Sequence, residues 1–178
     1  MLTITIPERE FLNEETMEFF TIPGTTLRLE HSLVSLAKWE STWKKPFLGK
    51  EKKTLSETLD YIRCMTITQN VSDEIYYMID NKTIEIINSY IEDPMTATTF
   101  NIKNKPDRSI ITAEIIYYWM IALNIPFECQ KWHLSRLLAL INVCNIKNQP
   151  KKKSTRADFV NARNELNAQR RAQLGSKG

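Results

Sequence analysis

The 178-residue sequence has little glycine and little cysteine, and each shortage excludes a class of site. Its four glycines are too few for the glycine-rich loops that bind phosphates or for the many turns of a β-sandwich. Its three cysteines, Cys64, Cys129 and Cys144, lack the paired C-x₂-C spacing of structural zinc sites. They fit free thiols in a reducing compartment. The first residues, MLTITIPERE, contain no basic region followed by a long apolar run, so they predict no secretory signal.

No apolar run is long enough to predict a membrane span. The longest runs from Ile110 to Ile125, contains Glu114 and stops before Pro126, whereas a span needs roughly 20 apolar residues. Because this run is apolar nearly all round, we expect it to form a central helix of the core.

Charge is distributed unevenly along the chain. Residues 147–178 contain nine Lys or Arg and two acids, which gives +7, and the whole chain carries +3, so residues 1–146 carry −4. This asymmetry predicts a mildly acidic body, residues 1–146, and a basic C-terminal extension, residues 147–178.

The hydrophobic pattern predicts a mostly α fold of the α+β type: a helical domain with a small N-terminal β element. Alternating side chains predict short strands near residues 2–6, 26–30 and 96–102. Helical periodicity covers the segments 32–43, 53–67, 72–80, 82–91, 109–125 and 126–146. Ser32 is a candidate cap, and Thr54 with Glu57 forms a capping-box pattern, as does Thr155 with Asp158. The extension has few apolar residues, so we expect it to be helical or disordered, and either mobile or docked on a partner.

The segment PFECQKWHLSRLLALINVCNI raises the question of a metal or catalytic site. As one helix begun by Pro126, it places Cys129 and His133 four residues apart on one face. Cys144 lies roughly 16 Å further along that helix, too far to share a metal with His133. A Cys–His nucleophile would also need an oxyanion hole and an orienting group, and the sequence indicates neither. We therefore predict one arm of a core helical hairpin, with no metal, no cofactor and no enzymatic activity.

Two groups of residues are candidates for partner binding. The first is aromatic, with lysines around it: Trp39, Trp43 and Phe47, which either anchor a partner or face the core. The second lies in the basic extension and would touch an acidic partner or nucleic-acid phosphates: Lys151, Lys152, Lys153, Arg156, Phe159, Arg163, Arg170 and Arg171. Phe159 is the single aromatic residue of the extension, which gives little support for base stacking.

Four segments carry a resemblance to a known family. SLVSLAKWESTWKKPFLGKEKKT, DYIRCMTI, EIIYYWMIALNIPFECQKWHLSRLLALI and NIKNQPKKK together resemble the tail assembly chaperones encoded in the tail-morphogenesis region of long-tailed bacteriophages. The resemblance extends from about Leu27 to the end of the chain.

The resemblance implies a non-enzymatic protein of virion morphogenesis that acts in the host cell cytoplasm. Proteins of this family keep the long helical tape-measure protein soluble until the tail tube polymerises around it, so the expected partner is a tape-measure or other tail protein. A homo-oligomer is also possible. Two alternatives stay open: a virion structural protein of the tail or of the head-to-tail connection, and a nucleic-acid-binding protein that acts through its basic extension.

Overall fold

The computed structural model describes residues 1–14, 17–99, 110–148 and 156–175. It divides the chain into two compact units, Met1–Asn145 and Ile146–Gly178. The described residues of the first unit form a β ribbon and six α-helices, which confirms a mostly helical α+β fold with a small N-terminal β element. The sequence placed the change from body to extension one residue later, between residues 146 and 147.

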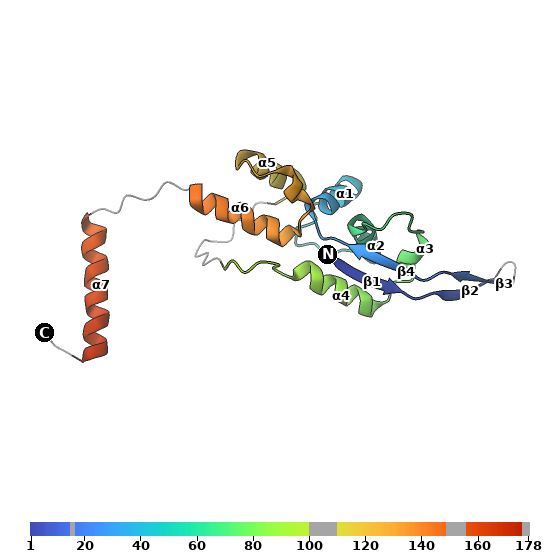
Figure 1. The fold of residues 1–178 in the computed structure, drawn as a ribbon, viewed down its shortest axis with the longest axis horizontal. Coiled ribbons are helices and arrows are strands. Elements are labelled where there is room, and N and C mark those ends of the chain that lie inside the picture. Colours follow the sequence, from blue (N-terminus) through green and yellow to red (C-terminus); the bar gives the residue numbers. More distant parts are fainter. Residues whose placement is uncertain (15–16, 100–109, 149–155, 176–178) are drawn as a thin grey trace. The chain divides into compact units, whose positions relative to one another are not determined.

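A long antiparallel ribbon forms the N-terminal part of the first unit (Figure 1). At its base β1 (Leu2–Ile6) pairs with β4 (Thr25–Leu29), and at its tip β2 (Arg9–Asn13) pairs with β3 (Glu18–Ile22). Leu2 faces Leu29 in the first ladder, and Arg9 faces Ile22 in the second. In both ladders the two residue numbers of a facing pair sum to 31, so the register stays the same from one ladder to the next. The two ladders are therefore one ribbon with a single interruption.

Proline and glycine explain that interruption. Pro7 and Pro23 stand between the two ladders, and proline has no N–H to donate to a ladder. At Gly24 an added Cβ would lie 2.9 Å from the backbone nitrogen of Glu8 and 3.0 Å from the carbonyl oxygen of Ile6. Glycine is required there because the two strands cross too closely for a side chain.

Helices cover the base of the ribbon. α1 (Leu33–Trp43) and α2 (Leu55–Met65) pack against each other, and in Figure 1 the strands β1 and β4 lie between this pair and α4 (Asn81–Glu92). The short α3 (Glu74–Tyr77) connects α2 to α4. The buried side chains of these elements form one core with those of the ribbon base, Ile4, Ile6, Leu27 and Leu29.

The helix starts follow the predicted caps. The hydroxyl of Ser32 accepts the backbone N–H of Ser35, and the Thr54–Glu57 capping box is complete in both directions. After α2 the chain returns to the ribbon, where the N–H of Ile67 donates to the carbonyl of Arg28 at 2.8 Å. The caps satisfy backbone donors that a helix start otherwise leaves unpaired.

The segment predicted as one helix over 126–146 is broken in the structure. It forms a 3₁₀ turn, η1 (Phe127–Lys131), and then α6 (Leu134–Asn148). Trp132 between them is extended, with ψ at 163°. The break comes from contacts with a distant segment. The N–H of Leu134 donates to the carbonyl of His31 at 2.7 Å, and His133 forms an isolated β-bridge with Ser32. The prediction that Cys129 and His133 share a face of one helix is therefore wrong.

Four further elements differ from the sequence predictions. Strands β2 and β3 were not predicted. No strand forms over residues 96–99, and residues 100–102 of the predicted third strand lie outside the described part. α5 (Ala113–Ala122) buries Ala113, Ile116 and Met120 on one side only, so it is not a central helix.

In its described residues the second unit holds the last residues of α6 and the whole of α7 (Arg156–Leu174), with Gly175 in a left-handed conformation directly after α7. A positive φ is easily adopted by glycine and commonly ends a helix. The extension is thus helical over these residues. Thr155, the predicted cap, lies outside the described part.

Candidate interaction surfaces

The predicted aromatic group is packed largely inside the first unit. Trp39 is 1% exposed and donates its ring N–H to the carbonyl of Glu57 at 2.9 Å. Phe47 is 8% exposed and stacks on Tyr61 with ring centroids 3.8 Å apart. Trp43 is half-buried and donates its ring N–H to Oδ2 of Asp60 at 2.9 Å. Trp39 and Phe47 therefore build the core, and Trp43 alone of the three offers part of its ring to a partner.

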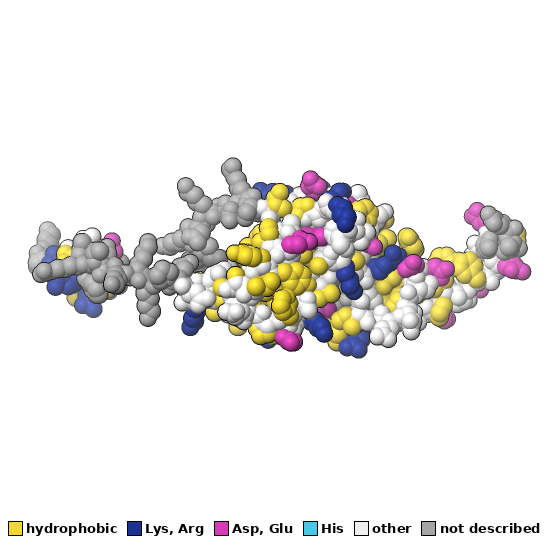
Figure 2. All heavy atoms as spheres, turned by 90° about the horizontal axis from the view of Figure 1, so that it is seen from above, with side chains coloured by type: hydrophobic (Ala, Val, Ile, Leu, Met, Phe, Trp, Pro, Cys, Tyr) yellow, Lys and Arg dark blue, Asp and Glu magenta, His cyan; other side chains and the backbone are white. Residues whose placement is uncertain are grey.

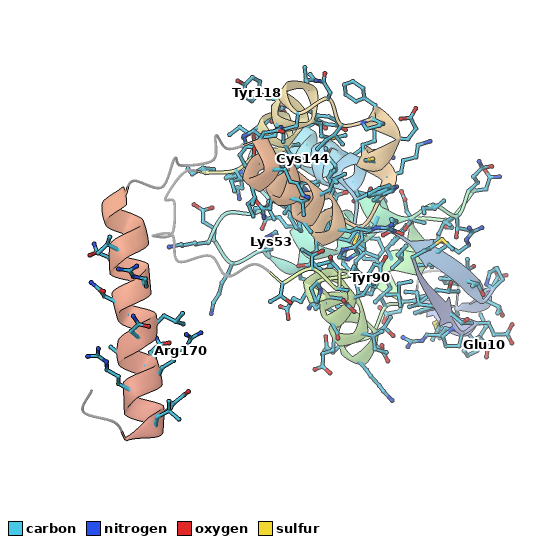
Figure 3. The ribbon with its side chains drawn as sticks, turned by 60° about the vertical axis from the view of Figure 1, so that its left-hand side comes forward. Glu10, Lys53, Tyr90, Tyr118, Cys144 and Arg170 are labelled. Carbon is cyan, nitrogen blue, oxygen red and sulfur yellow. The ribbon has the colours of Figure 1, made fainter. Side chains whose placement is uncertain are left out.

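The predicted basic group is placed only in part. Arg163, Arg170 and Arg171 are exposed on α7. Arg156 and Phe159 lie in the first turn of α7, and Lys151, Lys152 and Lys153 lie outside the described residues. Figure 3 shows Arg170 projecting from the helix.

Apolar side chains gather on α5, on a surface that the sequence did not reveal. Tyr118 is 66% exposed, Ile121 61% and Phe127 50%. Tyr117 joins these residues, since its ring centroid lies 6.4 Å from that of Phe127. Figure 2 shows hydrophobic side chains concentrated over α5. We call Tyr117, Tyr118, Ile121 and Phe127 the α5 surface. Contiguous exposed apolar groups of this kind mark protein or ligand contacts.

Helix geometry explains why α5 has this surface. Ala113, Ile116 and Met120 recur at steps of three and four and face the core. Tyr118 and Ile121 occupy the other side of the helix, and three further apolar residues, Ile115, Trp119 and Leu123, are half-buried between the two sides. Tyr117 donates its hydroxyl to Oε1 of Gln130 at 2.9 Å, which fixes one ring of the surface. Burial raises the pKa of Tyr117, so the hydroxyl stays protonated at neutral pH.

The hairpin β2–β3 forms a second exposed surface. Phe11 and Phe20 stack with ring centroids 5.8 Å apart and are 37% and 47% exposed. Leu12 and Phe19 face each other across the strands and are 43% and 69% exposed. An isolated two-stranded hairpin is at best marginally stable in water. Sequence reasoning missed this element, although its aromatic and β-branched residues, EFFTI, give a strand signal.

The two histidines belong to a buried polar cluster. Nδ1 of His31 lies 2.6 Å from the hydroxyl of Tyr61, and Nε2 of His133 lies 3.0 Å from the carbonyl oxygen of Tyr90. The hydroxyl of Tyr90 donates to Oε1 of Glu30 at 2.6 Å. Burial, with a smaller contribution from His133, lowers the pKa of His31 from 6.5 to about 3. Burial also lowers the pKa of His133. Both rings are therefore neutral at neutral pH.

The surroundings of Cys64 and Cys129 keep both side chains in the thiol form. Burial and the charge of Asp60 raise the pKa of Cys64 to about 11, although this residue borders a groove of about 400 Å³ beside α1 and α2. Burial and Glu128 also raise the pKa of Cys129. A thiol acts as a nucleophile through its thiolate, which both shifts disfavour. Among the described residues, no three His, Cys, Asp or Glu side chains are grouped to hold a metal ion.

No family model, no curated protein and no solved structure matches this chain. Within the parts of the chain that the structure describes, no helix combines the length and the apolar character needed to cross a membrane.

Proposed function

We propose that this chain is a non-enzymatic bacteriophage tail assembly chaperone that binds the tape-measure protein in the host cell cytoplasm. The family assignment rests on the resemblance described above, and the α5 surface is the observation that carries the binding role. Tyr118, Ile121 and Phe127 leave half or more of their side-chain surface in solvent. A protein that keeps an apolar-patterned helical chain soluble needs such a surface outside its own core.

The α5 surface suits an amphipathic helix. Tyrosine and phenylalanine supply large contact areas at low cost in side-chain entropy, and aromatic residues dominate the energetics of protein interfaces. Burying Ile121 and Phe127 under a client would contribute roughly 1–2 kcal/mol each, because both keep half or more of their surface to lose. Such contacts depend weakly on salt, unlike contacts to phosphates.

Co-expression with the tape-measure protein tests the proposal. We would recover this chain and identify its partners by mass spectrometry at low and high salt, comparing Tyr118→Ala/Ile121→Ala with the matched control Tyr77→Ala/Ile86→Ala. Tyr77 on α3 and Ile86 on α4 are of the same two residue types and are also exposed, by 75% and 47%. We expect the tape-measure protein to be recovered at both salt concentrations with the wild type and with the control, and to be lost with the α5 variant.

Three other outcomes would overturn this proposal. Equal recovery of the tape-measure protein with the α5 variant and with the control would remove the α5 surface from the binding role. The presence of this chain in purified particles would favour a virion structural protein. Recovery of nucleic acid alone, lost at high salt, would favour phosphate binding by Arg163, Arg170 and Arg171, which are exposed on α7.

A further inference from the structure

The hairpin β2–β3 is acidic as well as apolar. Residues 7–24 contain five glutamates and one arginine, a net charge of −4. The strand register places Glu10 and Leu12 opposite Thr21 and Phe19, so these four residues share one face of the hairpin. Glu14 follows at the turn and is exposed. We call Glu10, Leu12, Glu14 and Phe19 the acidic hairpin face. Figure 3 shows Glu10 on this part of the ribbon.

Helix α7 carries the opposite pattern. Arg163, Leu166, Arg170 and Leu174 follow at steps of three and four and therefore form one stripe along the helix. All four are exposed, Leu166 by 47% and Leu174 by 78%. Glu165 lies on the far side of the helix from this stripe, because residues two positions apart on an α-helix point to opposite sides. We call the four residues the basic stripe.

The two patterns match in spacing as well as in charge. Glu10 lies in β2 and Glu14 at the turn directly after it, four residues further on, so at most roughly 13 Å of extended chain separates them at 3.3 Å per residue. Arg163 and Arg170 are seven residues apart along a helix, roughly 10 Å at 1.5 Å per residue, and arginine side chains easily make up the difference. Leu12 lies between the two glutamates as Leu166 lies between the two arginines. Carboxylate–guanidinium pairs would thus flank an apolar contact.

Chain length favours a neighbouring copy as the source of the stripe. Seven residues separate α6 from α7 and span at most about 25 Å. Arg163 lies roughly 10 Å further along α7, so the first arginine of the stripe reaches at most about 35 Å from the end of α6. The ribbon from Leu2 to Asn13 is roughly 40 Å long, and in Figure 1 its tip and the last turns of α6 within the first unit lie at opposite ends of that unit.

We infer that the acidic hairpin face binds the basic stripe of a second copy of this chain. The contact is head-to-tail, because hairpin and stripe are different surfaces, so each copy still offers a free hairpin at one end and a free stripe at the other. Such contacts build open chains or closed rings. The inference is independent of the client and of the α5 surface.

Light scattering on the purified, nuclease-treated full chain tests the inference. At 50 mM salt we expect a mass that exceeds the 20.8 kDa of one chain and rises with protein concentration. At 500 mM salt we expect the mass to fall toward one chain, because exposed ion pairs are screened. The variants Glu10→Lys/Glu14→Lys and Arg163→Glu/Arg170→Glu should each weaken the association at least tenfold. The control, Glu85→Lys/Glu92→Lys on exposed positions of α4, changes the net charge by the same amount and sign as the hairpin variant and should associate as the wild type does.

The decisive sample is an equimolar mixture of the two charge-reversed variants. Each alone carries like charges on hairpin and stripe, but in the mixture every hairpin finds a stripe of opposite charge, so we expect association to return. Circular dichroism checks that both variants are folded. A wild type that stays monomeric at 50 mM salt would overturn the inference, as would a mixture that fails to associate. Association found only in a sample that has not been treated with nuclease would overturn it too.

Discussion

Glu40 joins three parts of the first unit, and its replacement by glutamine is the sharpest test of the packing. The side chain is 8% exposed. Its Oε1 accepts the backbone N–H of Phe47 at 2.7 Å, and its Oε2 accepts that of Ala113, also at 2.7 Å. Ala113 is the first residue of α5, and its N–H is one of the donors that a helix start leaves unpaired. The carboxylate therefore connects α1 to the following loop and to α5.

The expected loss follows from these two bonds. A hydrogen bond to a charged group contributes about 1.5–3 kcal/mol, and a buried donor without a partner costs about 1–3 kcal/mol. Glutamine keeps one oxygen acceptor and turns an NH₂ group toward the other N–H, so one bond is lost and the other weakened. The favourable interaction of a negative charge with the start of α5 is lost too. We expect Glu40→Gln to lower the free energy of unfolding by about 3 kcal/mol.

Urea unfolding followed by tryptophan fluorescence measures this loss, and a thermal melt should show a decrease of about 6–12 °C for a chain of this size. Glu85→Gln on the exposed side of α4 is the matched control and should change the free energy of unfolding by less than about 0.5 kcal/mol. A loss below about 1 kcal/mol for Glu40→Gln would refute the reasoning, because it would mean that the two N–H groups find other partners.

Three further predictions concern pH, a helix cap and a half-buried tryptophan. Because the pKa of His31 is about 3 in the folded chain and 6.5 is its ordinary value, the unfolded chain takes up the proton first. The free energy of unfolding should thus fall by up to about 1.4 kcal/mol per unit as the pH drops from 6.5 toward 3; urea titrations that agree at pH 7 and pH 4.5 would contradict this. Thr54→Ala removes the hydroxyl that caps α2 and should cost about 1 kcal/mol in a thermal melt, while Thr42→Ala, at an exposed position of α1, should cost less. Trp43→Phe removes the hydrogen bond to Asp60 and should cost about 1 kcal/mol without reducing recovery of the tape-measure protein; a loss of that protein would return Trp43 to the binding surface.

Local chemistry made much of the fold predictable. Ser32 and Thr54 cap helices where the sequence placed the caps. Caps are predictable because the capping hydroxyl accepts a backbone N–H only three residues further along the chain. The base strands were predictable for a similar reason, since alternation in Leu2–Ile6 follows from one buried and one exposed face.

What the sequence did not predict depends on contacts between distant segments. The break before α6 arises because His133 pairs with Ser32, about a hundred residues earlier, and helical periodicity continues through it unchanged. The α5 surface was hidden for another reason. An apolar helix in the core and an apolar helix that meets a partner have the same composition, so Tyr118 and Ile121 gave no sign of being exposed.

The constant register of the ribbon also bears on the order in which the strands can pair during folding. Pairing β1 with β4 directly would close a loop of 18 residues, 7–24, at a cost of roughly 2–3 kcal/mol in chain entropy. If β2 and β3 pair first, as a local hairpin can within microseconds, the ladder has to cross only residues 7–8 and 23–24. The tip, which leaves Phe11, Leu12, Phe19 and Phe20 exposed, would then speed the folding of a core to which those four side chains do not belong.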